Sequence, residues 1–251
     1  MAGACISVDR ILSKLDEYLN KNDYVLAEKH LLYWFSEAKN NNDLKVELLV
    51  SNELMGLYRK LGRKDEALSC VDNALNRIED AGIAMQVGAA TTYLNSATVY
   101  KAFGMARQSI HLFEKAKDIY ERELDANDTR LAGLYNNMAL AFVDLKDFDK
   151  AEKLYNDAIG IMEKSEGGDL EIAITYLNLA TASEARLGLL DAEESINKYL
   201  DLAQTILDSH EPKDGYYAFV CEKCASVFGY YGWFFFENEL KDRARRIYAG
   251  N

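Results

Sequence analysis

The stretch that decides the fold is LYNNMALAFVDLKDFDKAEKLYNDAIGIMEK, residues 134–164. Apolar and small residues stand at helical spacing on both sides of a short turn sequence at 145–147, in which Asp147 can cap the second helix. The first run shares one helix face through Tyr135, Met138, Ala139 and Phe142. The second run shares one helix face through Ala151, Tyr155 and Ala158. The stretch therefore predicts two antiparallel helices that approach closely where their small residues meet.

This helix pair recurs along the chain. Small residues mark the same place in the second helix at intervals of 42, 42 and 41 residues: Ala67, Ser109, Ala151 and Ala192. One such pair cannot bury its apolar faces alone, so the pairs must stack on one another. We predict an all-α, right-handed superhelical solenoid of antiparallel helix pairs with about twelve helices. It forms a single domain over 1–251, with an N-terminal helix pair at 1–43, well-matched repeats at 44–207 and C-terminal capping helices at 208–251.

Composition and charge limit the classes of partner and the cellular location that we expect for this chain. Apolar residues make up 49% of the 251, and the single Pro leaves long helices uninterrupted. The formal net charge of −12 argues against nucleic acid and anionic membranes as partners. No apolar run reaches the roughly 18 residues that span a bilayer, and charged residues interrupt the start of the chain where a signal peptide would be apolar. We expect a cytoplasmic protein.

The pattern resembles the tetratricopeptide repeat, and the match extends over about residues 44–205. The phrases Asn-Asn-Met-Ala-Leu-Ala at 136–141 and Ala-Glu-Lys-Leu-Tyr at 151–155 carry it most clearly. The long 42-residue unit is similar to the repeats of kinesin light chain, although the Pro that usually ends a unit is absent. The resemblance implies a non-enzymatic protein–protein interaction scaffold that binds a peptide or protein segment in its concave groove. The alternative is a regulator that responds to a signalling peptide.

The resemblance also implies which residues face the groove, because first-helix positions 2, 5, 6, 9, 12 and 13 line it in the family. The candidate binding residues at these positions are Asn52, Arg59, Asn95, Thr98, Lys101, Asn136, Asn137, Leu140, Asn178 and Thr181. Asparagine recurs at position 6 as Asn95, Asn137 and Asn178. A carboxamide both donates and accepts hydrogen bonds, so it can pair with the backbone of an extended ligand. The same asparagines could instead bond within or between repeats as framework.

Cys221 and Cys224 form the one CxxC pair and suggest a metal- or redox-responsive protein as a further alternative. The other two cysteines lack CxxC spacing, whereas a structural zinc site usually has four ligands. When repeat positions are numbered in the last helix pair, both cysteines fall at positions that we expect to be buried in the other repeats. A buried thiol packs as a small apolar group. We expect core packing, no metal and no cofactor. No catalytic constellation appears, so we do not expect an enzyme.

The densest aromatic stretch is FGYYGWFFF at 228–236. It predicts a terminal helix that covers the last open face of the stack. The alternative is a contact with a partner or a homodimer, because exposed aromatic patches mark interfaces.

Overall fold

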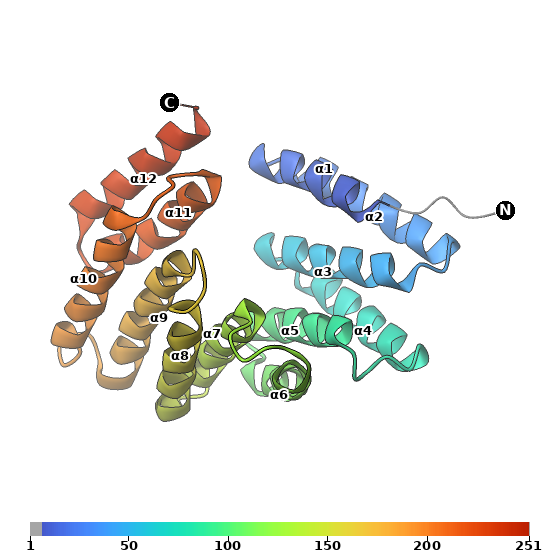
Figure 1. Cartoon of the computed structure of the whole chain (residues 1–251), viewed down its shortest axis with the longest axis horizontal. Coiled ribbons are helices and arrows are strands. Elements are labelled where there is room, and N and C mark those ends of the chain that lie inside the picture. The colour runs from blue at the N-terminus through green and yellow to red at the C-terminus, as the bar shows by residue number, and fades with distance from the viewer. Residues whose placement is uncertain (1–6, 251) are drawn as a thin grey trace. The chain divides into compact units, whose positions relative to one another are not determined.

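The computed structural model describes residues 7–250, and these form twelve helices and no strand, which confirms the predicted all-α fold (Figure 1). The helices are α1 (Val8–Asn20), α2 (Tyr24–Asn40), α3 (Leu44–Lys60), α4 (Lys64–Asp80), α5 (Val87–Ala102), α6 (Ala106–Glu123), α7 (Thr129–Asp144), α8 (Phe148–Met162), α9 (Asp169–Leu187), α10 (Glu193–Ser209), α11 (Gly215–Tyr230) and α12 (Phe234–Tyr248). Among residues 7–250, no helix combines the length and the apolar character that a membrane crossing requires.

The helices group into two compact units, one formed by α1 to α6 and the other by α7 to α12. Consecutive helices pair in each unit, and the first helices of neighbouring pairs pack side by side: α3 with α5 in the first unit, and α7 with α9 and α9 with α11 in the second. This is the predicted helix-pair repeat. The single continuous domain over 1–251 and its superhelical path stay predictions.

The turn inside each pair contains a residue with a left-handed backbone. Glycine supplies this residue four times with φ between 69° and 87°, at Gly62, Gly104, Gly188 and Gly232, because it has no side chain to clash there. Lys146 occupies the equivalent position with φ of 62°, which strains an L-residue. Asp147 then accepts a hydrogen bond from the Lys150 backbone N–H at 3.4 Å, so it caps α8 as predicted.

Small residues set the close packing of the helices, as expected. The four that mark the period are completely buried: Ala67, Ser109, Ala151 and Ala192. The fifth pair departs from the pattern, because Tyr199 stands where a small residue is expected. Its ring stacks on Tyr176 with the ring centroids 6.1 Å apart, so a flat aromatic contact replaces the close approach.

One charge is buried between α3 and α4. The Glu47 side chain is only 2% exposed, whereas that of Arg77 is 37% exposed. The Arg77 guanidinium donates three hydrogen bonds of 3.0–3.2 Å to the two carboxylate oxygens. Because a buried carboxylate without a partner is costly, this pair fixes α4 against the first turns of α3.

Candidate protein-binding groove

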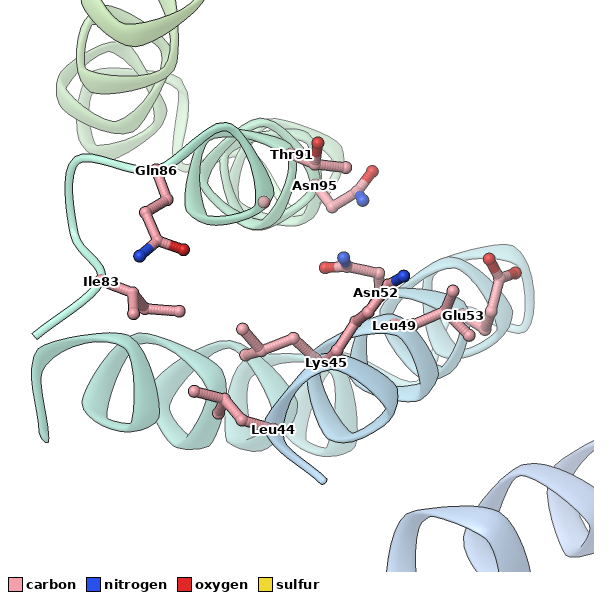
Figure 2. Close-up of a pocket in the computed structure, with 11 residues that line it drawn as sticks. Leu44, Lys45, Leu49, Asn52, Glu53, Ile83, Gln86, Thr91 and Asn95 are labelled. Atoms are coloured by element: carbon pink, nitrogen blue, oxygen red, sulfur yellow. The ribbon is translucent and has the colours of Figure 1, made fainter. Parts of the chain in front are cut away.

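A pocket of about 650 Å³ lies between α3 and α5 in the first unit (Figure 2). Its apolar lining consists of Leu44, Leu48, Leu49 and Ile83. Its polar lining consists of Lys45, Asn52, Glu53, Gln86, Thr91 and Asn95. An apolar floor with a few polar groups around it is the usual composition of a ligand site.

The linker between α4 and α5 closes one end of this pocket. Gly82 adopts φ of 65° just after α4, and the Ile83 N–H then donates to the Ile78 carbonyl at 3.2 Å. This helix-ending arrangement turns the chain back, so that the Ile83 side chain faces the pocket, and Gln86 also reaches into it (Figure 2). The local backbone therefore positions two residues of the pocket wall.

Two of the predicted asparagines line the pocket with unused hydrogen-bonding capacity. The Asn52 amide nitrogen donates to the Thr92 hydroxyl at 3.3 Å, and its Oδ1 is buried with no donor among residues 7–250. An unsatisfied buried carbonyl typically costs about 1–3 kcal/mol. Asn95 projects from α5 on the other side (Figure 2), and its amide makes no hydrogen bond within the described part of the chain.

The asparagines of the second unit are placed differently. The Asn178 amide nitrogen donates to Oδ1 of Asn136 at 3.0 Å, which links α9 to α7. The Asn137 amide nitrogen donates to the Gly133 carbonyl of its own helix at 2.8 Å. These bonds hold the helices of the repeats in place, which is the framework role that the sequence analysis gave as the alternative to ligand contact. Contact of these three residues with a ligand stays a prediction.

The other candidate residues also lie on the first helices of their pairs. The Thr98 and Thr181 hydroxyls each donate to a carbonyl four residues earlier, at 2.8 and 3.1 Å. Arg59 is exposed near the end of α3, and Lys101 and Leu140 are half-buried. None of these five residues lines the pocket between α3 and α5, so a ligand role for them stays a prediction.

Charged groups stand at the rim of the pocket. Burial, followed by the negative charge of Asp16 on α1, raises the pKa of the Glu53 carboxyl. Lys45 is exposed on α3, one turn before Leu49. The pocket lining therefore includes one carboxyl group and one ammonium group, both from α3.

Sequence reasoning did not identify the residues that make the pocket apolar. Leu44, Leu48 and Ile83 lie outside the groove-facing positions of the family pattern, and Gln86 lies in a linker. One signal was present: the α4–α5 linker carries apolar residues at 83–85 directly after Gly82, whereas most linkers of this chain are polar. Apolar residues in a turn need a surface to contact.

The cysteine pair lies in the core of the second unit, as predicted. Cys221 and Cys224 are at most 1% exposed and pack with Tyr217 and Phe228. Burial raises the pKa of both thiols, that of Cys224 to about 12. The thiolate, which is the form that binds metal and reacts, is therefore disfavoured. Within residues 7–250, no group of three or more His, Cys, Asp or Glu side chains could hold a metal ion.

Comparison with known proteins places this geometry in a class of helix-pair repeat folds. A tetratricopeptide-repeat family model matches residues 130–205. BtubC (BKLC) from P. vanneervenii is 20% identical, with 82% of each chain covered and a TM-score of 0.67. A putative kinesin light chain from Podosopora anserina, with nearly identical TPR-like repeats, is 16% identical, with 81% of this chain and 96% of that chain covered and a TM-score of 0.54.

A third solved structure, the apo form of the quorum sensor NprR from B. thuringiensis, is 16% identical over 94% of this chain and 63% of that one, with a TM-score of 0.56. No curated protein sequence matches. Residues 130–205 are therefore tetratricopeptide repeats, and the fold is tetratricopeptide-like, with kinesin-light-chain-type structures among its neighbours. Repeats of this type typically mediate protein–protein interactions and generally act without catalysis.

Proposed function

We propose that this chain is a non-enzymatic scaffold that binds an extended protein segment along α3 and α5. One apolar side chain of the segment enters the pocket of about 650 Å³, and the segment's backbone pairs with the amides of Asn52 and Asn95. The observation that carries this proposal is the Asn52 carbonyl, which is buried beside an apolar pocket with no donor among the described residues. If the Asn52 side-chain amide rotates toward the pocket, it loses only its 3.3 Å hydrogen bond to the Thr92 hydroxyl.

The energies indicate how much of the groove the segment must use. Burying one leucine-sized side chain contributes about 1.5–3 kcal/mol. Two amide hydrogen bonds add about 1 kcal/mol each. Micromolar affinity requires about 8 kcal/mol, so further contacts along the first helices are needed. Thr98 and Lys101 continue the α5 face beyond Asn95 and extend the proposed contact.

The proposed ligand is a protein or peptide. Nucleic acids and anionic membranes are negatively charged, so we do not propose them as partners of a chain with a net charge of −12. A regulator that responds to a signalling peptide stays an alternative prediction, because the likeness to the quorum sensor concerns the fold alone. The cytoplasmic location also stays a prediction.

The test uses peptides selected from a random-sequence display library on the full chain. Each selected peptide is synthesised, and its dissociation constant is measured by fluorescence anisotropy. Leu49→Asp places a charge in the pocket wall and should raise the dissociation constant at least about tenfold. Leu202→Asp changes an exposed leucine of the second unit and serves as the matched control. Equal affinities for wild type and Leu49→Asp, with both variants folded by circular dichroism, would contradict the proposal.

A further inference from the structure

An exposed apolar surface lies at the turns of the last two helix pairs. We call it the aromatic edge, and it consists of Leu187, Leu189, Leu190, Tyr230, Phe234 and Phe235. At least half of each residue is exposed, and the exposed fraction reaches 85% for Leu190 and 96% for Phe235. Monomeric proteins rarely expose a contiguous apolar patch larger than a few hundred Å².

The two turns meet at one groove. A groove of about 350 Å³ is lined by Leu189 and Leu190 from the α9–α10 turn and by Tyr230 and Tyr231 from the end of α11. Both tyrosine hydroxyls donate to the Glu184 carboxylate at 2.8 Å, which ties the end of α11 to α9. These two bonds hold the α11 wall of the groove against α9.

The repeat fold does not require these apolar side chains. Three of the corresponding turns, at 21–23, 62–64 and 145–147, are polar apart from one leucine, whereas the α5–α6 turn carries Phe103 and Met105. The core of the last pair is already filled by Phe228 and Phe236, which are at most 6% exposed and have their ring centroids 4.7 Å apart. Phe235 takes no part in that packing. The aromatic stretch is thus divided between residues that close the core and residues that face outward.

The aromatic edge carries both a projecting side chain and a groove. Phe235 projects from the first turn of α12, and the groove opens beside the Tyr231–Gly232 turn that leads into this helix. A two-fold symmetric contact uses the same surface on both copies, so that surface must be complementary to itself, as a projection with a matching hollow on one face is. The aromatic edge meets this requirement.

Area and charge are also suitable for self-association. At about 200 Å² per aromatic residue, the three aromatics of the edge expose on the order of 450 Å², and the three leucines bring the edge toward the ~800 Å² that each partner buries in a standard interface. Residues 228–250 carry four basic and three acidic side chains. The α12 side of the edge therefore carries a net charge near zero, whereas Glu193 lines the groove on the α9–α10 side.

We propose that the aromatic edge is the contact surface between two copies of this chain, with Phe235 of each copy seated in the groove of its partner. The surface belongs to the second unit and the proposed segment-binding pocket to the first. The two proposals therefore rest on different residues and can fail separately.

The test measures the mass of the full chain by sedimentation velocity across the micromolar concentration range. The wild type should reach the mass of a dimer of the 28.4 kDa chain. Phe235→Ser and Leu190→Ser, one from each turn, should each raise the dimer dissociation constant about 30-fold, as expected for a central interface residue. Phe219→Ser is the matched control, because Phe219 is a half-exposed phenylalanine on α11 outside the edge.

A wild type that stays monomeric throughout this range would overturn the proposal and leave the edge to a different partner. A dimer that Phe235→Ser and Leu190→Ser do not weaken, or that Phe219→Ser weakens equally, would also overturn it. Circular dichroism checks that each variant is folded, and the substituted side chains are exposed, so loss of the core is not expected.

Discussion

The buried Glu47–Arg77 pair should respond asymmetrically to the loss of its two members. Arg77→Met leaves the Glu47 carboxylate 2% exposed and without its three hydrogen bonds. Breaking a fully buried ion pair from one side costs about 3–5 kcal/mol. The Arg77 side chain is 37% exposed, so water can enter part of the space that it leaves. We therefore expect Arg77→Met to destabilise the chain by about 2 kcal/mol.

Glu47→Met should have a smaller effect. The Arg77 guanidinium can turn toward water once its partner is gone, because more than a third of the side chain is already exposed. The methionine also fills much of the volume of the glutamate with apolar atoms. We expect a loss of at most about 1 kcal/mol, and the double variant should resemble Glu47→Met alone.

The measurement is urea unfolding followed by circular dichroism, with all three variants compared with wild type as a double-mutant cycle. Glu47 and Arg77 lie in the same helix pair, so the comparison holds even where a repeat array unfolds in steps. The expected coupling between the two sites is about 2 kcal/mol. Equal losses for the two single variants, or additive losses in the double variant, would refute the argument that a buried carboxylate dominates this site.

Three further predictions concern the turns, the framework and the thiols. Lys146→Gly relieves a left-handed lysine and should raise stability by about 0.5–1 kcal/mol in thermal unfolding, whereas Lys153→Gly in the α8 interior should lower it by about 1 kcal/mol. Asn178→Ala removes the 3.0 Å bond to α7 and should lower the free energy of unfolding by about 1 kcal/mol, measured as a lower unfolding midpoint. Burial raises the pKa of the Cys221 and Cys224 thiols, so below these raised values both stay protonated, and a thiol reagent at about pH 8 should label them only after denaturation. Rapid labelling of either cysteine in the native chain would support the redox alternative instead.

The fold could be predicted from the sequence because the residues that pack between helices recur from repeat to repeat, whereas the surface residues do not. Ala67, Ser109 and Ala151 recur since two helices can approach closely only over small side chains, and the structure buries all three completely. The same logic placed Cys221 and Cys224 in the core, because they occupy positions that other units fill with apolar residues.

The candidate site was only partly predictable. Repeat position identified Asn95, Asn137 and Asn178 as equivalent, but the structure gives them different surroundings: an open pocket for Asn95, the helix's own backbone for Asn137, and a neighbouring amide for Asn178. A periodic pattern contains no information on which neighbour a carboxamide reaches. The apolar pocket depends on Ile83, which lies in a linker between repeats, where the period says nothing about side-chain direction.

The central claim, that a protein segment lies along α3 and α5, is tested most directly by mapping where a bound peptide touches the chain. A selected peptide is synthesised with a photoreactive leucine at its main apolar position, irradiated in complex with the full chain, and its attachment sites are read by mass spectrometry. We predict attachment within residues 44–53 of α3 and 83–95 around the start of α5. Attachment confined to the second helices of the pairs, α2, α4 and α6, or to the second unit would contradict the proposed groove.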